Sequence, residues 1–164
     1  MTKELYIAGP MGFSEAGRDF MYNRLMPAIK ETGFSIIDPW KLTPQEQIDK
    51  ILAMHLSPEK QKALADMNRK IGSKNEEGIR RAFGIVSMLD GPDVDSGTAG
   101  EIGFCYGLGK SVLGYRNDFR LSSENIGAKV NIQVEYFILN SPGGEIISSI
   151  SELPSALTRI FGTP

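Results

Sequence analysis

The chain has 164 residues, 41% of them apolar, with a formal net charge of −2, which predicts one soluble domain over residues 1–164 with a buried core. No run of Lys or Arg supports binding to a nucleic acid polymer, and no apolar stretch or signal-peptide pattern indicates a membrane, so we expect a cytoplasmic protein. A single histidine, His55, and a single cysteine, Cys105, argue against a zinc site, a disulfide and a Ser-His or Cys-His catalytic pair, so we expect no metal and no cofactor.

The first part of the chain predicts a β-α-β unit. Residues 5–8 are apolar and predict a strand, and Ser14 is a suitable N-cap for the helix that follows. Gly33 is expected to end this helix before a second strand over residues 34–37.

A polar segment follows over residues 42–71, rich in Gln and Lys and helical in propensity. We expect Gly72 to break this helical run. The spacing of Ser73 and Glu76 then predicts a capping box that begins a short helix ending at Ala82.

The rest of the chain continues the alternation of strands and helices. Predicted strands cover residues 83–89 and 111–115, and predicted helices cover 98–108, ended by Gly109, and 151–161. Residues 130–138 alternate apolar and polar side chains with period two, which favours a half-buried strand, although the same residues can form a helix. The sequence therefore predicts an α/β doubly wound parallel sheet of about five strands with helices on both faces.

Four carboxylates lie in the segment that leads from the strand over residues 83–89 into the first turn of the next helix: Asp90, Asp93, Asp95 and Glu101. The carboxyl end of a parallel strand is where open α/β sheets bind ligands. Near the start of a helix, the dipole favours negative charge, so we expect Glu101 to be ionised. The spacing from Thr98 to Glu101 also fits a capping box that would occupy this carboxylate, whereas Gly97 and Gly100 favour the approach of a ligand. Ordinary turn chemistry also accounts for Asp90 and Asp93.

The first strand lacks the features of two other kinds of α/β domain. No G-x-G-x-x-G follows it, which argues against NAD, and it does not end in the acidic pair of a phospho-accepting receiver domain. Trp40, after the second strand, is equally consistent with packing and with an aromatic wall of a ligand site.

Four segments carry a resemblance to a known family: Tyr6-Ile-Ala-Gly-Pro10, the central run from Asp90 to Gly103, the run from Gly107 to Asp118, and Val130 to Phe137. Together they resemble the nucleoside 2-deoxyribosyltransferases over nearly the whole chain. The resemblance implies a flavodoxin-like fold. It also implies transfer of 2-deoxyribose between nucleobases, from a deoxynucleoside to a free base, through a covalent glycosyl-enzyme intermediate.

The resemblance also implies roles for single residues. Glu101 would be the nucleophile, Asp95 the proton donor and acceptor for the base, and Tyr6 the residue that positions the nucleophile. Asn131 matches an asparagine that reaches the sugar 5′-hydroxyl from a neighbouring subunit, in a region that is helical in the family. The expected assembly is therefore a homodimer or larger homo-oligomer with shared active sites.

Asn75 stands where some family members place a second base-contacting aspartate, and an amide can both donate and accept. This departure leaves the choice of base open. The residues expected to bind substrate are Gly9, Trp40, Asn75, Asp93 and Asn131.

A carboxylate nucleophile fits this chemistry, because displacement at an anomeric carbon passes through an oxocarbenium-like state, as in retaining glycosidases. Two alternatives stay open. One is a hydrolase of deoxynucleosides or their 5′-monophosphates, with Ser14 and Arg18 binding a phosphate at a helix start. The other is a module that binds a nucleotide without turnover.

Overall fold

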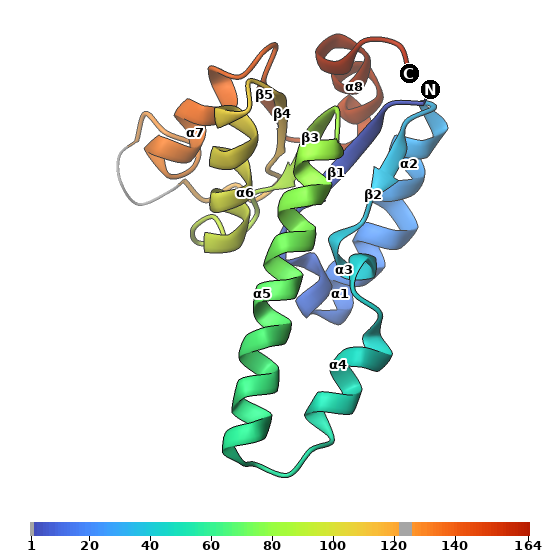
Figure 1. Cartoon of the computed structure of the whole chain (residues 1–164). Helices are drawn as coiled ribbons and strands as arrows, with labels where there is room; N and C mark the ends of the chain where they lie inside the picture. Colours follow the sequence, from blue (N-terminus) through green and yellow to red (C-terminus); the bar gives the residue numbers. More distant parts are fainter. Residues whose placement is uncertain (1, 122–125) are drawn as a thin grey trace.

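The computed structural model describes residues 2–121 and 126–164, which build a parallel sheet of five strands (Figure 1). The strand order is β2-β1-β3-β4-β5, and every neighbouring pair is parallel. This is the flavodoxin-like order, so the predicted fold class is confirmed. The strands are β1 (Glu4–Ala8), β2 (Ser35–Ile37), β3 (Gly84–Met88), β4 (Ser111–Tyr115) and β5 (Glu145–Ile147).

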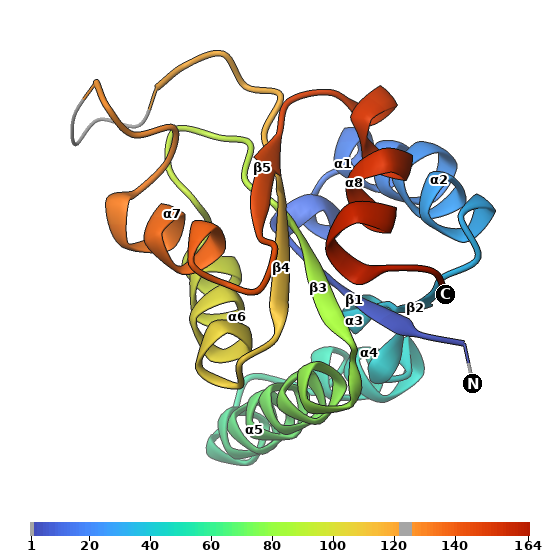
Figure 2. The ribbon, with the colours of Figure 1, turned by 90° about the horizontal axis from the view of Figure 1, so that it is seen from above.

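Helices cover both faces of the sheet (Figure 2). One face packs against α1 (Glu15–Phe20), the π-helical turn η2 (Met21–Leu25), α2 (Met26–Glu31) and α8 (Leu153–Phe161). The other face packs against α5 (Pro58–Arg81), α6 (Ser96–Gly107) and α7 (Ile132–Leu139). The other helical segments are η1 (Pro10–Phe13), α3 (Pro39–Leu42), α4 (Gln45–Leu52) and η3 (Ile150–Glu152).

Strand β1 contributes side chains to the hydrophobic cores on both faces of the sheet. Its side chains alternate between the faces, so that Leu5 and Ile7 join the core under α1, α2 and α8. Tyr6 and Ala8 join the core under α5, α6 and α7. Tyr6 is fully buried, and its position on the second face directs its hydroxyl toward α6.

Several boundaries predicted from the sequence are confirmed. Ser14 caps α1, because its hydroxyl accepts from the Gly17 amide at 3.0 Å. Gly33 and Gly109 follow their helices with φ of 92° and 69°, a conformation that favours glycine. No helix in the described ranges combines the length and the apolarity that a membrane crossing requires.

The predicted break at Gly72 is wrong, because α5 runs without interruption from Pro58 to Arg81. Its N-cap is Ser57, whose hydroxyl accepts from the Lys60 amide, so the capping box at Ser73 is not used. An interior glycine costs about 1 kcal/mol relative to alanine, too little to interrupt a helix of 24 residues whose last turns are held by the buried Gly78 and Ile79. Figure 1 shows α4 and the first part of α5 extending beyond the sheet.

The strand expected over residues 130–138 is also wrong, and α7 occupies most of it. Asn131 caps this helix, its Oδ1 accepting from the amides of Gln133 at 3.0 Å and Val134 at 3.3 Å. Val134 and Ile138, four residues apart, are buried in the core, while Ile132 and Tyr136 stay exposed. The fifth strand instead lies at β5, which is only three residues long and was not predicted.

Candidate active site

A cavity of about 420 Å³ opens beside the carboxyl end of β1. Its walls come from the loop after β1, from α3, from α5 and from the start of α6. In this strand order the connections diverge between β1 and β3, which is the switch point where open α/β sheets bind ligands.

Tyr6 and Glu101 form the central hydrogen bond of the site. The Tyr6 hydroxyl donates to Glu101 Oε1 at 2.6 Å, which joins β1 to α6. Burial, and then the charge of Glu101, hold the pKa of Tyr6 far above its ordinary value, so the phenol stays a donor. Glu101 lines the cavity, and its Oε2 has no hydrogen-bond partner among the described residues.

Burial raises the pKa of Glu101 to about 7. The hydrogen bond from Tyr6 opposes this shift, and the charge of Asp95 adds to it. The expectation of a carboxylate held ionised by the helix dipole therefore needs correction, because the dipole acts mainly within the first turn and Glu101 lies six residues beyond the N-cap. Near neutral pH both protonation states of Glu101 are populated.

Asp95 lines the same cavity and is the N-cap of α6. Its Oδ2 accepts from the amide and the hydroxyl of Thr98, both at 3.0 Å. The helix therefore begins earlier than predicted, and the alternative of a capping box between Thr98 and Glu101 does not hold. Because Asp95 satisfies the first turn of α6, Glu101 is not needed as a cap and faces the cavity.

One wall of the cavity is a face of α5. Asn68, Ile71 and Asn75 are spaced by three and four residues, which places them on one side of a helix. The Oδ1 of Asn75 is buried without a hydrogen-bond partner in the described part of the chain. We did not anticipate Asn68 or Ile71, because the expected break at Gly72 hid this spacing.

Two aromatic side chains, Phe13 and Trp40, also line the cavity. Trp40, at the start of α3, and Phe13, in η1, contact each other edge to face with ring centroids 4.7 Å apart. Gly9 also lines the cavity. The chain passes close to the end of β3 at this residue, because a Cβ added to Gly9 would lie 2.8 Å from Met88 Cβ. The structure thus brings Tyr6, Gly9, Trp40, Asn75, Asp95 and Glu101 to one site.

Asp93 and Asn131 do not line this cavity. Asp93 is exposed, and its Oδ1 accepts from the next amide, that of Val94, at 2.7 Å. Asn131 caps α7. Within this chain neither residue reaches the cavity that holds Glu101.

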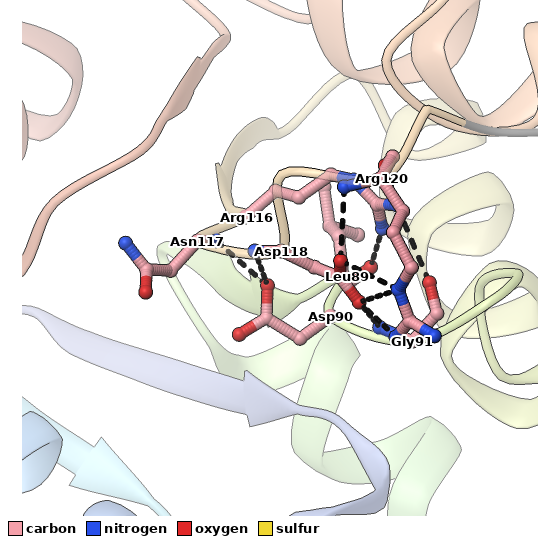
Figure 3. Close-up of polar contacts among 7 residues, drawn as sticks. All are labelled: Leu89, Asp90, Gly91, Arg116, Asn117, Asp118 and Arg120. Atoms are coloured by element: carbon pink, nitrogen blue, oxygen red, sulfur yellow. Dashed lines mark hydrogen bonds and ion pairs between the residues drawn. The ribbon is translucent and has the colours of Figure 1, made fainter.

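Asp90 is not among the residues that line the cavity, and it joins two loops (Figure 3). Its Oδ1 accepts from the amides of Asn117 at 2.6 Å and Asp118 at 2.8 Å. The buried guanidinium of Arg116 donates to carbonyls on both loops, those of Leu89, Gly91 and Arg120. These bonds hold the chain after β3 against the chain after β4, and so support the segment that leads to Asp95.

Ser14 and Arg18 also lie outside the residues that line the cavity. The Ser14 hydroxyl caps α1, and Arg18 Nη1 donates to the carbonyl of Gly12 at 2.9 Å. None of the described residues that line the cavity is a cation, whereas Asp95 and Glu101 are both acids.

Comparison with known proteins adds a family match. The model of the family described as nucleoside 2-deoxyribosyltransferase matches residues 5–133. A 2-desoxiribosyltransferase from Leishmania mexicana superposes with a TM-score of 0.64 at 22% identity, covering 94% of this chain and 96% of that one. The CMP N-glycosidase BcmB of Clostridium botulinum superposes with a TM-score of 0.55 at 15% identity, covering 94% and 97%. At these identities the two structures show a common fold.

A sequence relative is an uncharacterized protein of Schizosaccharomyces pombe, 26% identical over 122 residues. The match covers 74% of this chain but 54% of that protein, so the chain spans about half the length of this relative.

Proposed function

Because this chain belongs to the nucleoside 2-deoxyribosyltransferase family, we propose that it transfers 2-deoxyribose from a deoxynucleoside to a different nucleobase. The observation that carries the proposal is the cavity shared by Asp95 and Glu101, in which Tyr6 holds one oxygen of Glu101. One carboxylate can attack while the other handles the proton.

In the first step, Glu101 Oε2 bonds to the anomeric carbon as the bond from that carbon to the base breaks. The departing base takes the bonding electron pair and receives a proton from Asp95. The Tyr6 hydroxyl donates to Oε1 and leaves the other oxygen to react. In the second step an incoming base attacks the anomeric carbon, displaces Glu101 and gives a proton to Asp95, so two inversions retain the configuration.

The charge of the cavity supports a neutral nucleoside over a 5′-monophosphate. Two acids line the cavity, and the described lining residues include no Lys, Arg or His to neutralise a phosphate. Ser14 and Arg18, which we considered as phosphate ligands, already bond to the backbone of their own segment.

We also propose that a second copy of the chain supplies Asn131 to the sugar 5′-hydroxyl. Two observations support this arrangement. Asn131 does not line the cavity of its own chain, and α7, which follows it, exposes three apolar side chains to solvent: Ile132, Tyr136 and Leu139. An exposed apolar helix face is typical of an interaction surface.

The test is to incubate the protein with a deoxynucleoside and a different free base, and to separate the products by chromatography. A new nucleoside supports the transferase. Release of free deoxyribose instead would establish a hydrolase, and no turnover with bound substrate would leave a binding module. Preference for a 5′-monophosphate donor would overturn the argument from cavity charge.

The nucleophile is tested with Glu101→Ala and a matched control, Glu31→Ala. Glu31 is exposed at the end of α2 and does not line the cavity. We expect Glu101→Ala to lose turnover by at least about a thousandfold while the control keeps it. Full turnover by Glu101→Ala would exclude the covalent mechanism.

A further inference from the structure

The indole of Trp40 occupies the space of a side chain at position 12. A Cβ added to Gly12 would lie 2.1 Å from Trp40 Cε2 and 2.3 Å from Cδ2. Both atoms belong to a rigid bicyclic ring, so no small rotation of a chain end would relieve the clash. With any residue other than glycine at position 12, the indole and the loop that carries this residue cannot both keep their present places.

The backbone of Trp40 is held from the other side by Asp38. Asp38 caps α3, its Oδ1 accepting from the Trp40 amide at 3.0 Å. Its second oxygen, Oδ2, accepts from the Tyr22 hydroxyl at 3.0 Å. Burial and then the bond to Asp38 raise the pKa of Tyr22 to about 12, so this phenol is a donor across the working range of pH.

Helix α3 has only four residues and is too short to be stable alone. Its position depends on these contacts with the rest of the protein. Tyr22 lies in the π-helical turn η2, and Lys41 Nζ lies over its ring at 4.9 Å from the centroid. Three separate segments thus converge on the placement of one indole: the loop after β1, the turn η2 and the end of β2.

We propose that Gly12, Asp38 and Tyr22 determine substrate specificity by holding Trp40 as a flat wall against which a planar heteroaromatic ring stacks. This inference rests on the proposed function, in which that ring is the nucleobase. Gly12 sets how closely the indole approaches the loop, and the bond from Tyr22 to Asp38 fixes the start of α3. Trp40 and Phe13 touch the ligand, whereas Gly12, Asp38 and Tyr22 act through Trp40.

The first experiment compares Gly12→Ala with Gly107→Ala. Gly107 is exposed in α6, and a Cβ added there meets nothing within 4 Å outside its own turn. We expect Gly12→Ala to raise the KM for the acceptor base about tenfold with little change in kcat, because stacking on the wall is lost. Trp40 is the only tryptophan, so its emission should shift to longer wavelength in this variant and not in the control.

A double-mutant cycle separates this mechanism from general damage. In a Trp40→Leu background, Gly12→Ala should raise KM no further, because the ring that it displaces is gone. Tyr22→Phe, a smaller change that should fold even if Gly12→Ala does not, should raise the same KM by a factor of about three. Additive effects of Gly12→Ala and Trp40→Leu, or a Tyr22→Phe variant with unchanged KM, would overturn the proposal.

Titration of the free base against tryptophan emission keeps the two proposals apart. In one outcome the wild-type protein shows no turnover, a free base quenches the emission of Trp40, and Gly12→Ala weakens that binding about tenfold. This outcome supports the stacking role of Trp40 and contradicts the transferase activity. In the other outcome the wild-type protein transfers deoxyribose and Gly12→Ala behaves like Gly107→Ala. This outcome supports the transferase activity and contradicts the stacking role of Trp40.

Discussion

At the scale of single residues, the site depends on one hydrogen bond between two elements. Tyr6 comes from a buried strand and Glu101 from a helix, and their bond occupies Oε1, which leaves Oε2 for the proposed attack. Burial makes the carboxylate a stronger nucleophile by raising its pKa to about 7, but it also leaves part of the population protonated near neutral pH. The Tyr6 hydroxyl limits this loss by favouring the charged form.

The pH dependence of turnover follows from this balance. A protonated Glu101 cannot attack, so kcat should fall below about pH 7 and lose about tenfold per pH unit on the acid side. Because the bond from Tyr6 lowers the pKa of Glu101, Tyr6→Phe should move the inflection to higher pH. The measurement is kcat against pH for wild type, Tyr6→Phe and a control, Tyr106→Phe, which lies outside the cavity lining. An inflection that does not move in Tyr6→Phe would contradict this account.

At the scale of the element, the N-cap of α6 combines a structural task with a proposed chemical one. Asp95 ends the loop that follows β3 and begins the helix, because its carboxylate accepts two bonds from Thr98. The same carboxylate faces the cavity. A cap needs only an acceptor, whereas the proposed reaction needs a group that can exchange a proton, so substitutions can separate the two tasks.

We expect Asp95→Ala to lose both the cap and the activity, with a loss of about 1 kcal/mol in the free energy of unfolding. Asp95→Asn should keep most of that stability, since asparagine is an equally good N-cap, but lose turnover because an amide does not donate a proton to the base. Urea denaturation and the transfer assay measure the two quantities on the same samples. An Asp95→Asn variant with wild-type turnover would remove the proton role from this residue.

At the scale of the whole molecule, the site exists because the sheet order places β1 beside β3. Strand β1 brings Tyr6, and the chain leaving β3 brings Asp95 and Glu101, although about ninety residues separate them. Helix α5 supplies one wall of the cavity. Arg116, directly after β4, holds the loop after β3 in place (Figure 3). Within one chain, Asn131 does not line this cavity.

Mixing two inactive variants tests whether copies share sites. Glu101→Ala lacks the proposed nucleophile, and Asn131→Asp keeps an N-cap for α7 while changing the group offered to the sugar. If sites are shared, a mixed dimer contains one site with both defects and one with neither, so activity should return on mixing. Light scattering on the same samples gives the assembly size. A mixture no more active than the sum of its parts would show that each chain works alone.

Particular elements show how much of the fold and of the site could be predicted from the sequence. The apolar runs at β1, β3 and β4 are strong local patterns, and Ser14, Gly33 and Gly109 end or begin helices by backbone chemistry that needs no distant partner. The acidic segment put forward Asp90, Asp93, Asp95 and Glu101 together, and the family resemblance singled out Asp95 and Glu101. The family resemblance suggested a role for Tyr6. The local pattern around Tyr6 indicates only a buried strand.

The sequence by itself determined the α/β alternation and the acidic segment, because strand and turn preferences act over a few residues. Only the tertiary structure decided that residues 132–139 form a helix, that α5 continues through Gly72, and that Gly12 lies beneath Trp40. In the first and third cases the deciding free energy comes from packing between segments far apart in the chain, which local propensities of about 1 kcal/mol cannot outweigh. Gly72 is exposed, and the similar cost of an interior glycine is too small to end α5 there.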